Sequence, residues 1–130
     1  MSYPAPLNNG VLGPPSTIVT LVAPMTSPPT NVYEGNGQLS IAMPIPGAHP
    51  EHVEVLVRPS TIDVRAECKY PQEVQHFLRH DWQVGSVATQ ISLPRTVDPM
   101  SARATLNFGV LVVMARLSDS GVGESRPQVE

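Results

Sequence analysis

The sequence predicts an all-β protein, an immunoglobulin-like antiparallel β-sandwich of seven to nine strands. Apolar and polar residues alternate in several short runs, as expected for strands with one buried face. These runs recur at intervals of about 8–14 residues and end at proline or glycine. No segment has the length and 3.6-residue period of a long helix. Short strands with frequent turns bury their apolar faces when two sheets pack face to face.

Three runs of alternating polarity occupy the first half of the predicted domain: residues 38–43, 53–58 and 62–67. The first ends at Pro44, and a Pro46-Gly47 turn and a short polar loop or helical turn at 49–52 follow it. The second and third are separated by a tight connection at residues 58–60. We therefore predict that these two runs form a hairpin.

Three further runs occupy the second half: residues 87–93, 102–106 and 110–115. Pro94 ends the first of them, and Phe108-Gly109 forms the turn between the other two. The last run is almost entirely apolar, which predicts a strand in the interior of a sheet. Residues 75–83 fit either a strand or a short helix, because Phe77 and Leu78 are adjacent.

Composition divides the chain into three segments. Residues 1–30 contain seven prolines and no charged residue or histidine, so we expect a disordered, uncharged arm, or merely a linker. Residues 31–117 hold the predicted sandwich, and residues 118–130, rich in Gly, Ser and charge, form a flexible C-terminal tail. The arm differs from an ordinary disordered tail because it carries apolar residues: Val11, Leu12, Ile18, Val19, Leu21, Val22 and Met25.

Charge and composition argue against several classes of partner. The net charge is −3, only one of the eight basic residues is a lysine, and aromatic residues make up 5% of the chain, so no nucleic-acid partner is predicted. The longest apolar run of the arm, residues 18–23, is too short to span a bilayer, so no membrane partner is predicted. A single cysteine, Cys68, excludes an internal disulfide. We expect a cytoplasmic protein.

No catalytic, metal or cofactor site is predicted. The chain lacks a nucleophile elbow, a pair of catalytic carboxylates and a phosphate-binding glycine loop, so we do not expect an enzyme. Cys68 lies between Glu67 and Lys69, whose charges act on its pKa in opposite directions, and an inert thiol is expected. His76 and His80 could share a metal on a helix, but on a strand they are ~13 Å apart.

Several segments, taken in order, resemble the α-crystallin domain of the small heat-shock proteins over about residues 32–116. The matching residues are Pro46, Gly47, Gly85, Leu93, Pro94, Ala104, Asn107, Gly109, Val110 and Leu111. The chain has Val87 where the family usually has an aromatic residue and Thr89 where it often has arginine. Family tails commonly carry an Ile/Val-x-Ile/Val element that docks on a neighbouring subunit, whereas here Val122 and Val129 lie seven residues apart.

The resemblance implies an ATP-independent chaperone that holds partly unfolded client proteins, with the apolar arm residues as the client-binding candidates. It also implies a homodimer formed by strand exchange, or a larger oligomer. The pairing segment would contain His76, Phe77, Leu78, Arg79 and Trp82, although Trp82 could equally serve in core packing. The strands that line the family's apolar groove would contribute Val53, Val55, Val57, Ala102, Ala104 and Leu106. The alternative is an adaptor or co-chaperone module that docks one specific partner.

Overall fold

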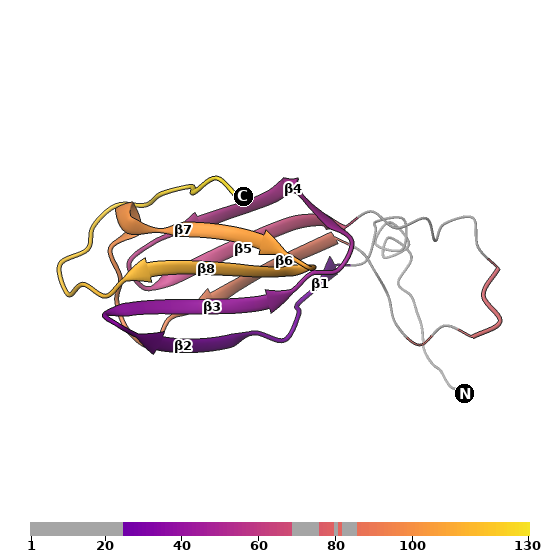
Figure 1. Ribbon diagram of the computed structural model, residues 1–130, viewed down its shortest axis with the longest axis horizontal. Coiled ribbons are helices and arrows are strands. Elements are labelled where there is room, and N and C mark those ends of the chain that lie inside the picture. Colours follow the sequence, from indigo (N-terminus) through magenta and orange to yellow (C-terminus); the bar gives the residue numbers. More distant parts are fainter. Residues whose placement is uncertain (1–24, 69–75, 80, 82–85) are drawn as a thin grey trace, which may run out of the picture.

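The computed structural model describes residues 25–68, 76–79, 81 and 86–130. Its elements, shown in Figure 1, are β1 (Met25–Thr26), β2 (Asn31–Gly35), β3 (Gln38–Pro44), β4 (Ala48–Val57), β5 (Thr61–Cys68), β6 (Ser86–Ser92), the 3₁₀ helix η2 (Pro99–Ser101), β7 (Arg103–Asn107) and β8 (Val110–Arg116).

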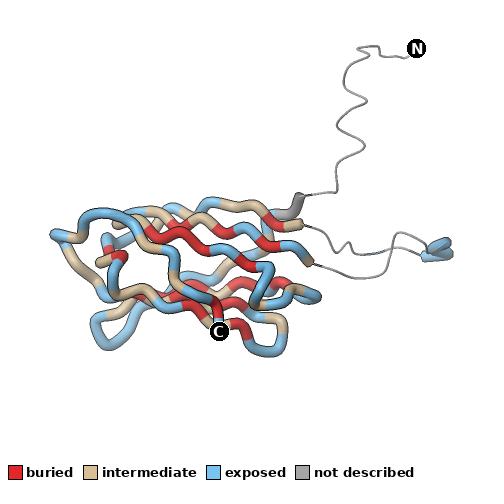
Figure 2. The backbone as a smooth tube through the Cα atoms, turned by 90° about the horizontal axis from the view of Figure 1, so that it is seen from above, coloured by how far each residue is buried: buried red, intermediate tan, exposed pale blue. Residues whose placement is uncertain are grey.

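The strands form two sheets packed face to face. One sheet has the order β1-β6-β5-β4 and the other the order β2-β3-β8-β7. All pairs are antiparallel except the short parallel pair of β1 with β6. The two layers are visible in Figure 1, and Figure 2 shows buried residues along the strands of both. The predicted β-sandwich is confirmed.

The period-2 alternation in the sequence gives each sheet its buried face. On β3, Leu39, Ile41 and Met43 are all at most 4% exposed, as predicted for the inner face of this strand. β8 lies between β3 and β7, which confirms its predicted place in the interior of a sheet. Its buried residues, which include Leu111, complete the core from this layer.

β4 is longer than the sequence predicts. It begins at Ala48 and includes residues 49–52, which were expected to form a polar loop or a helical turn. Its register with β5 shifts between Ala48 and Val53. Pro50 lies in the shifted part, where its missing N–H interrupts no regular ladder. The expectation of a loop was wrong because a strand with an irregular stretch loses the clean alternation that identifies it.

The hairpin of β2 and β3 was not predicted as such. Its turn residues are Asn36 and Gly37, whose φ angles are +56° and +75°. Both central residues of a type I′ turn need positive φ, and Asn-Gly is the preferred pair. The signal for this hairpin was therefore present in the sequence. The 3₁₀ helix η2 is also additional to the prediction, and it begins where the Oδ1 atom of Asp98 accepts a hydrogen bond (3.0 Å) from the backbone N–H of Met100.

Candidate interaction surfaces

Four strands lie at the edges of the two sheets: β1 and β4 in one, β2 and β7 in the other. The outer backbone N–H and C=O groups of an edge strand can pair with another chain unless they are covered. Which of these edges is covered therefore decides where this domain can take a partner.

The C-terminal residues cover the edge of β4. Residues 121–130 are called the C-terminal strap below. Its Ser125 forms two backbone hydrogen bonds of 2.9 Å with Val57, each residue donating its N–H to the carbonyl oxygen of the other. The Ser125 hydroxyl also donates to the carbonyl oxygen of Pro99. The strap thus extends the first sheet by a short antiparallel bridge.

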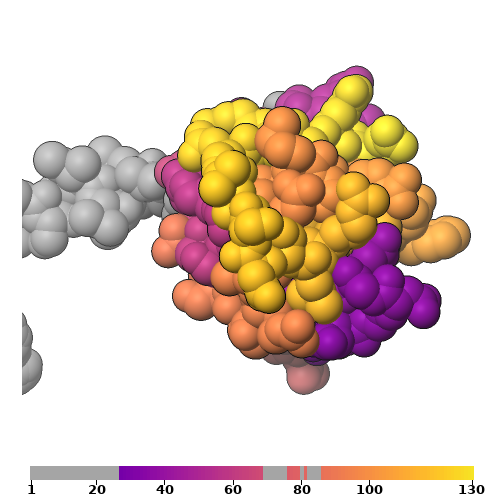
Figure 3. All heavy atoms as spheres, turned by 90° about the vertical axis from the view of Figure 1, so that its left-hand side faces the viewer, coloured from indigo at the N-terminus to yellow at the C-terminus, as the bar shows by residue number. Residues whose placement is uncertain are grey.

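The last two residues of the strap cover the edge of β7. Glu130 donates its backbone N–H to the carbonyl oxygen of Ala104 (3.1 Å) and accepts a hydrogen bond from the N–H of Leu106 (3.2 Å). Val129 forms a parallel bridge with Ala104, and its side chain is only 8% exposed. Figure 3 shows the C-terminal residues, in yellow, lying across this end of the molecule. One segment therefore pairs with an edge strand of each sheet, at Val57 of β4 and at Ala104 and Leu106 of β7.

The path of the chain toward the strap is fixed by close contacts. The N–H of Ser118 donates to the carbonyl oxygen of Thr96 (3.0 Å), and the Thr96 hydroxyl donates to the carbonyl oxygen of Ser118 (2.8 Å). At Gly121, a Cβ atom would overlap the carbonyl oxygen of Val97. Glycine at this position lets the strap pass against the loop that connects the two sheets.

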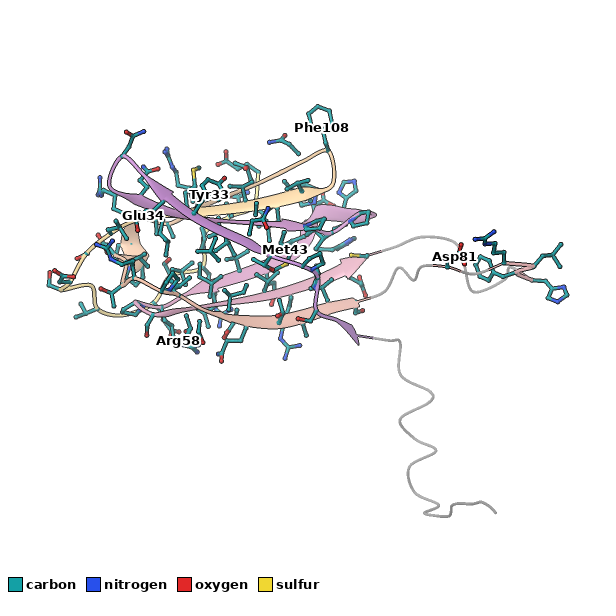
Figure 4. All side chains as sticks on the ribbon, turned by 90° about the horizontal axis from the view of Figure 1, so that it is seen from below. Tyr33, Glu34, Met43, Arg58, Asp81 and Phe108 are labelled. Carbon is teal, nitrogen blue, oxygen red and sulfur yellow. The ribbon has the colours of Figure 1, made fainter. Side chains whose placement is uncertain are left out.

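An arginine links the strap to the first sheet. The Arg58 side chain donates to Asp63 Oδ2 (3.0 Å), and its Nε lies 3.4 Å from Glu124 Oε1. The three side chains are between 31% and 53% exposed, so this network is solvated and contributes little to stability. Figure 4 shows Arg58 on the face of the sandwich away from Tyr33 and Phe108.

The predicted groove side chains are part of the core. Five of the six are buried: Val53, Val55, Val57, Ala104 and Leu106. Ala102 is half-buried and follows η2, so it precedes β7. The hydrogen bonds of the strap to Val57, Ala104 and Leu106 are all made by backbone groups. Binding of a client or a second copy at this edge stays a prediction, as does the flexibility of residues 118–130.

Among the described residues β2 has a strand neighbour on one side only, β3, and the Arg95 side chain contacts β2 through an ion pair with Glu34 (3.0 Å). All five of its residues are exposed, including Tyr33 at 52%. In the hairpin of β2 and β3, Gly35 and Gln38 flank the two-residue turn and form a hydrogen-bonded pair. Pairs without and with hydrogen bonds then alternate along the two strands. Val32 and Glu34 therefore direct their backbone groups away from β3. By the same rule the N–H of Leu106 in β7 points away from β8, and it donates to the carbonyl oxygen of Glu130 in the strap.

The predicted pairing segment is exposed. His76, Phe77, Leu78 and Arg79 are all exposed, Leu78 at 95%, and residues 76–79 are not assigned as a strand. Arg79 Nε donates to Asp81 Oδ2 (2.7 Å), and Figure 4 shows Asp81 well away from the two sheets. The backbone groups of a strand need the hydrogen-bonding partners that a neighbouring strand supplies. Pairing of this segment with a second copy of the chain stays a prediction.

Most of the predicted arm residues, and two other predicted residues, lie outside the part of the chain that the structure describes. Trp82 and Gly85 lie outside the described residues. So do the arm residues Val11, Leu12, Ile18, Val19, Leu21 and Val22. Met25 alone of the arm set is placed: it lies in β1, paired with Ser86 of β6.

The family-motif residues build two adjoining turns at one end of the sandwich. Gly47 and Gly109 have φ angles of +86° and +77°, which glycine adopts without strain. Ile45, just before the Pro46-Gly47 turn, donates its N–H to the carbonyl oxygen of Gly109 (2.7 Å). These glycines are therefore structural. Phe108, between Asn107 and Gly109, is fully exposed and projects outward in Figure 4.

The outer faces of the two sheets differ in polarity. Glu54, Asp63 and Arg65 lie on the outer face of the first sheet, opposite the buried residues that alternate with them. The outer face of the second sheet carries mostly uncharged residues: Tyr33, Ser40, Ala42, Thr105, Val112 and Met114. Arg103 and Arg116 also lie on this face, at its β7–β8 end, in register with Met114 and Gln38. The uncharged part of the face can cover apolar surface on another protein without desolvating charges.

The described residues offer little for covalent or metal chemistry. Burial raises the pKa of the half-buried Cys68 thiol, so it is protonated at neutral pH and is a poor nucleophile. In the described ranges no three His, Cys, Asp or Glu side chains gather in a way that could hold a metal ion. No helix among these residues is long and apolar enough to cross a membrane.

The profile of the Hsp20/alpha crystallin family matches residues 31–128. The chain belongs to the Hsp20/alpha crystallin family. No significant match is found among curated proteins. The match includes most of the C-terminal strap as well as the sandwich.

Solved structures of small heat-shock proteins share this fold. Heat shock protein 16.0 from Schizosaccharomyces pombe is 21% identical, with a TM-score of 0.64 over 75% of this chain and 71% of that one. A small heat-shock protein from Xylella fastidiosa is 22% identical, with a TM-score of 0.64 over 77% and 94%. HspA from Xanthomonas axonopodis is 22% identical, with a TM-score of 0.62 over 74% and 96%. These likenesses concern the fold.

Proposed function

We propose that this chain is an ATP-independent holdase, a chaperone that binds partly unfolded proteins and suppresses their aggregation. The observation that carries the proposal is the family match over residues 31–128. The mostly uncharged outer face of the second sheet and the exposed side chains of Leu78, Met100 and Phe108 support it. Partly unfolded proteins expose apolar surface, and reversible cover by such surfaces keeps them from one another. This mechanism requires binding and no catalysis.

The test is light scattering by several unrelated proteins heated with and without the chain, in the absence of nucleotide. We expect suppression of aggregation for each of them at near-stoichiometric ratios, because recognition of exposed apolar surface does not depend on the client's identity. If the chain protects none of them but binds a single protein tightly, the adaptor alternative holds and the holdase proposal is wrong.

We also propose that the chain pairs with itself through the open edge of β2. The strap already pairs with the other two long edge strands, at Val57 of β4 and at Ala104 and Leu106 of β7. A second copy can add a strand to β2, with residues 75–83 as the predicted donor. Backbone hydrogen bonds then supply the affinity, and the exposed Val32 and Tyr33 supply side-chain contacts. Pairing would also protect an edge that is otherwise prone to aggregation.

Replacing Val32 with proline should abolish this pairing. Val32→Pro removes an outward-facing N–H donor and leaves the hydrogen bonds to β3 in place. Sedimentation is expected to show a halved mass at a concentration where the parent chain is paired. Val32→Ala, which keeps the donor, should retain the parent's mass, and circular dichroism should show that both variants are folded. A Val32→Pro chain of unchanged mass would place the interface elsewhere.

A further inference from the structure

Two hairpin turns of this chain share one backbone geometry but differ in their first residue. Asn36 and Gly37 connect β2 to β3 with φ angles of +56° and +75°. Phe108 and Gly109 connect β7 to β8 with φ angles of +54° and +77°. Asparagine adopts such a positive φ readily, whereas for a bulky aromatic residue it is strained. Phe108 therefore destabilises its turn relative to an asparagine in the same place.

Packing within the chain does not offset the strain at Phe108. Its side chain is fully exposed (104%), so the ring gains no burial against the sandwich. Figure 4 shows the ring projecting outward from one end of the two sheets. A strained residue without stabilising contacts in its own fold is a candidate for a function outside that fold.

The surroundings of Phe108 are uncharged. The term apolar tip is used below for four exposed residues of the two adjoining turns and their flanks: Pro44, Pro46, Phe108 and Val110. Pro44 and Val110 lie side by side in the register of β3 and β8. The two runs of sequence that build the tip, residues 38–48 and 104–115, contain no charged residue. An apolar segment of another protein can cover the tip without desolvating a charge of these runs.

The turn also fixes the direction of the ring. β7 and β8 are paired up to Asn107 and Val110, the residues immediately before and after the turn. A two-residue turn between paired strands has little conformational freedom, so the ring is held away from the sandwich. Binding through a ring that is already presented to solvent orders few further torsions, which keeps its entropic cost small.

We propose that Phe108 is a client-contact residue, held in a strained conformation at a cost in stability, through which the apolar tip binds apolar segments of partly unfolded proteins. The proposal rests on the proposed holdase function and adds a second contact site to the arm. Partly unfolded proteins expose such segments, so the protruding ring requires no shaped pocket in its partner. An aromatic ring also supplies a large apolar contact area from a single side chain.

Urea denaturation at one protein concentration tests the strain. Phe108→Asn should raise the midpoint by about 0.5 M, because asparagine tolerates the φ of the turn and no buried contact is lost. The reciprocal variant Asn36→Phe should lower the midpoint by a similar amount, since it places the aromatic residue in the matching turn. An unchanged or lower midpoint for Phe108→Asn would overturn the proposal.

Binding of a permanently unfolded protein tests the contact without heating, so differences in stability between the variants do not affect the result. The probe is fluorescently labelled, reduced and carboxymethylated α-lactalbumin, followed by anisotropy. Phe108→Asn should weaken its binding at least threefold, and Phe108→Trp, which keeps an aromatic ring, should bind it as the parent does. Equal binding by the parent and Phe108→Asn would overturn this proposal and leave the holdase proposal intact, whereas a parent that does not bind the probe would contradict both.

Sedimentation separates a client from a second copy as the occupant of the apolar tip. Phe108→Asn should keep the mass of the parent chain at the same concentration, because the tip is not assigned to self-association. A halved mass would instead assign Phe108 to an interface between copies and would overturn the client proposal.

Discussion

A Leu111→Ala chain is expected to be less stable than the parent by about 2–5 kcal/mol. Leu111 is fully buried between the sheets and lies beside Met43 and Leu106 on the neighbouring strands. Truncation removes apolar contacts from both neighbours and leaves a cavity that a packed core fills only partly. A domain of this size has a free energy of unfolding of roughly 5–15 kcal/mol, so the loss is a large fraction of the total.

Urea denaturation followed by circular dichroism measures this effect. The matched control is Val110→Ala, one residue earlier on the same strand, because Val110 is 37% exposed and points to the other face. We expect its midpoint to move little, within about 0.5 kcal/mol. Similar losses in the two variants would mean that β8 is not the central strand of this core.

Removing residues 1–23 is expected to leave the sandwich folded and to abolish most of the suppression of client aggregation. The arm is uncharged and carries six of the seven predicted client-binding residues in this stretch. Ending the deletion before Met25 keeps β1, which pairs with β6 at the edge of the first sheet. A deletion extending to Pro29 would confound loss of the arm with loss of this strand.

Light scattering of heated clients gives the comparison with the intact chain. The control is a chain of full length in which the apolar arm residues, from Val11 to Val22, are replaced by serine. If apolar contact is what the arm supplies, this variant should be as ineffective as the deletion. Undiminished suppression by the deleted chain would exclude the arm as the client surface.

The sequence predicts the sandwich well because its core depends on local patterns. Alternation on β3 and the continuous apolar run of β8 identify a half-buried and an interior strand from neighbouring residues alone. The irregular start of β4 breaks this alternation, so residues 49–52 resembled a loop. Asn36-Gly37 did carry a readable hairpin signal, which a search for type I′ turns would find.

The C-terminal strap could not be predicted in the same way. Its contacts join residues far apart in the chain: Ser125 with Val57 and Glu130 with Ala104. They are mostly backbone hydrogen bonds, which leave no residue pattern behind. One valine among polar residues looks like a solvated tail until the edge it covers is known. The lack of an Ile/Val-x-Ile/Val element distinguished this tail from the tails of other family members, but it did not indicate which residues the tail contacts.

The most direct test of the proposed chaperone is its effect on several unrelated proteins heated without nucleotide, measured as light scattering over a range of ratios. We predict that scattering falls for every client as the ratio of chain to client approaches one, and that clients stay in the soluble fraction together with the chain. Unchanged scattering for all of them, at every ratio, would contradict the account.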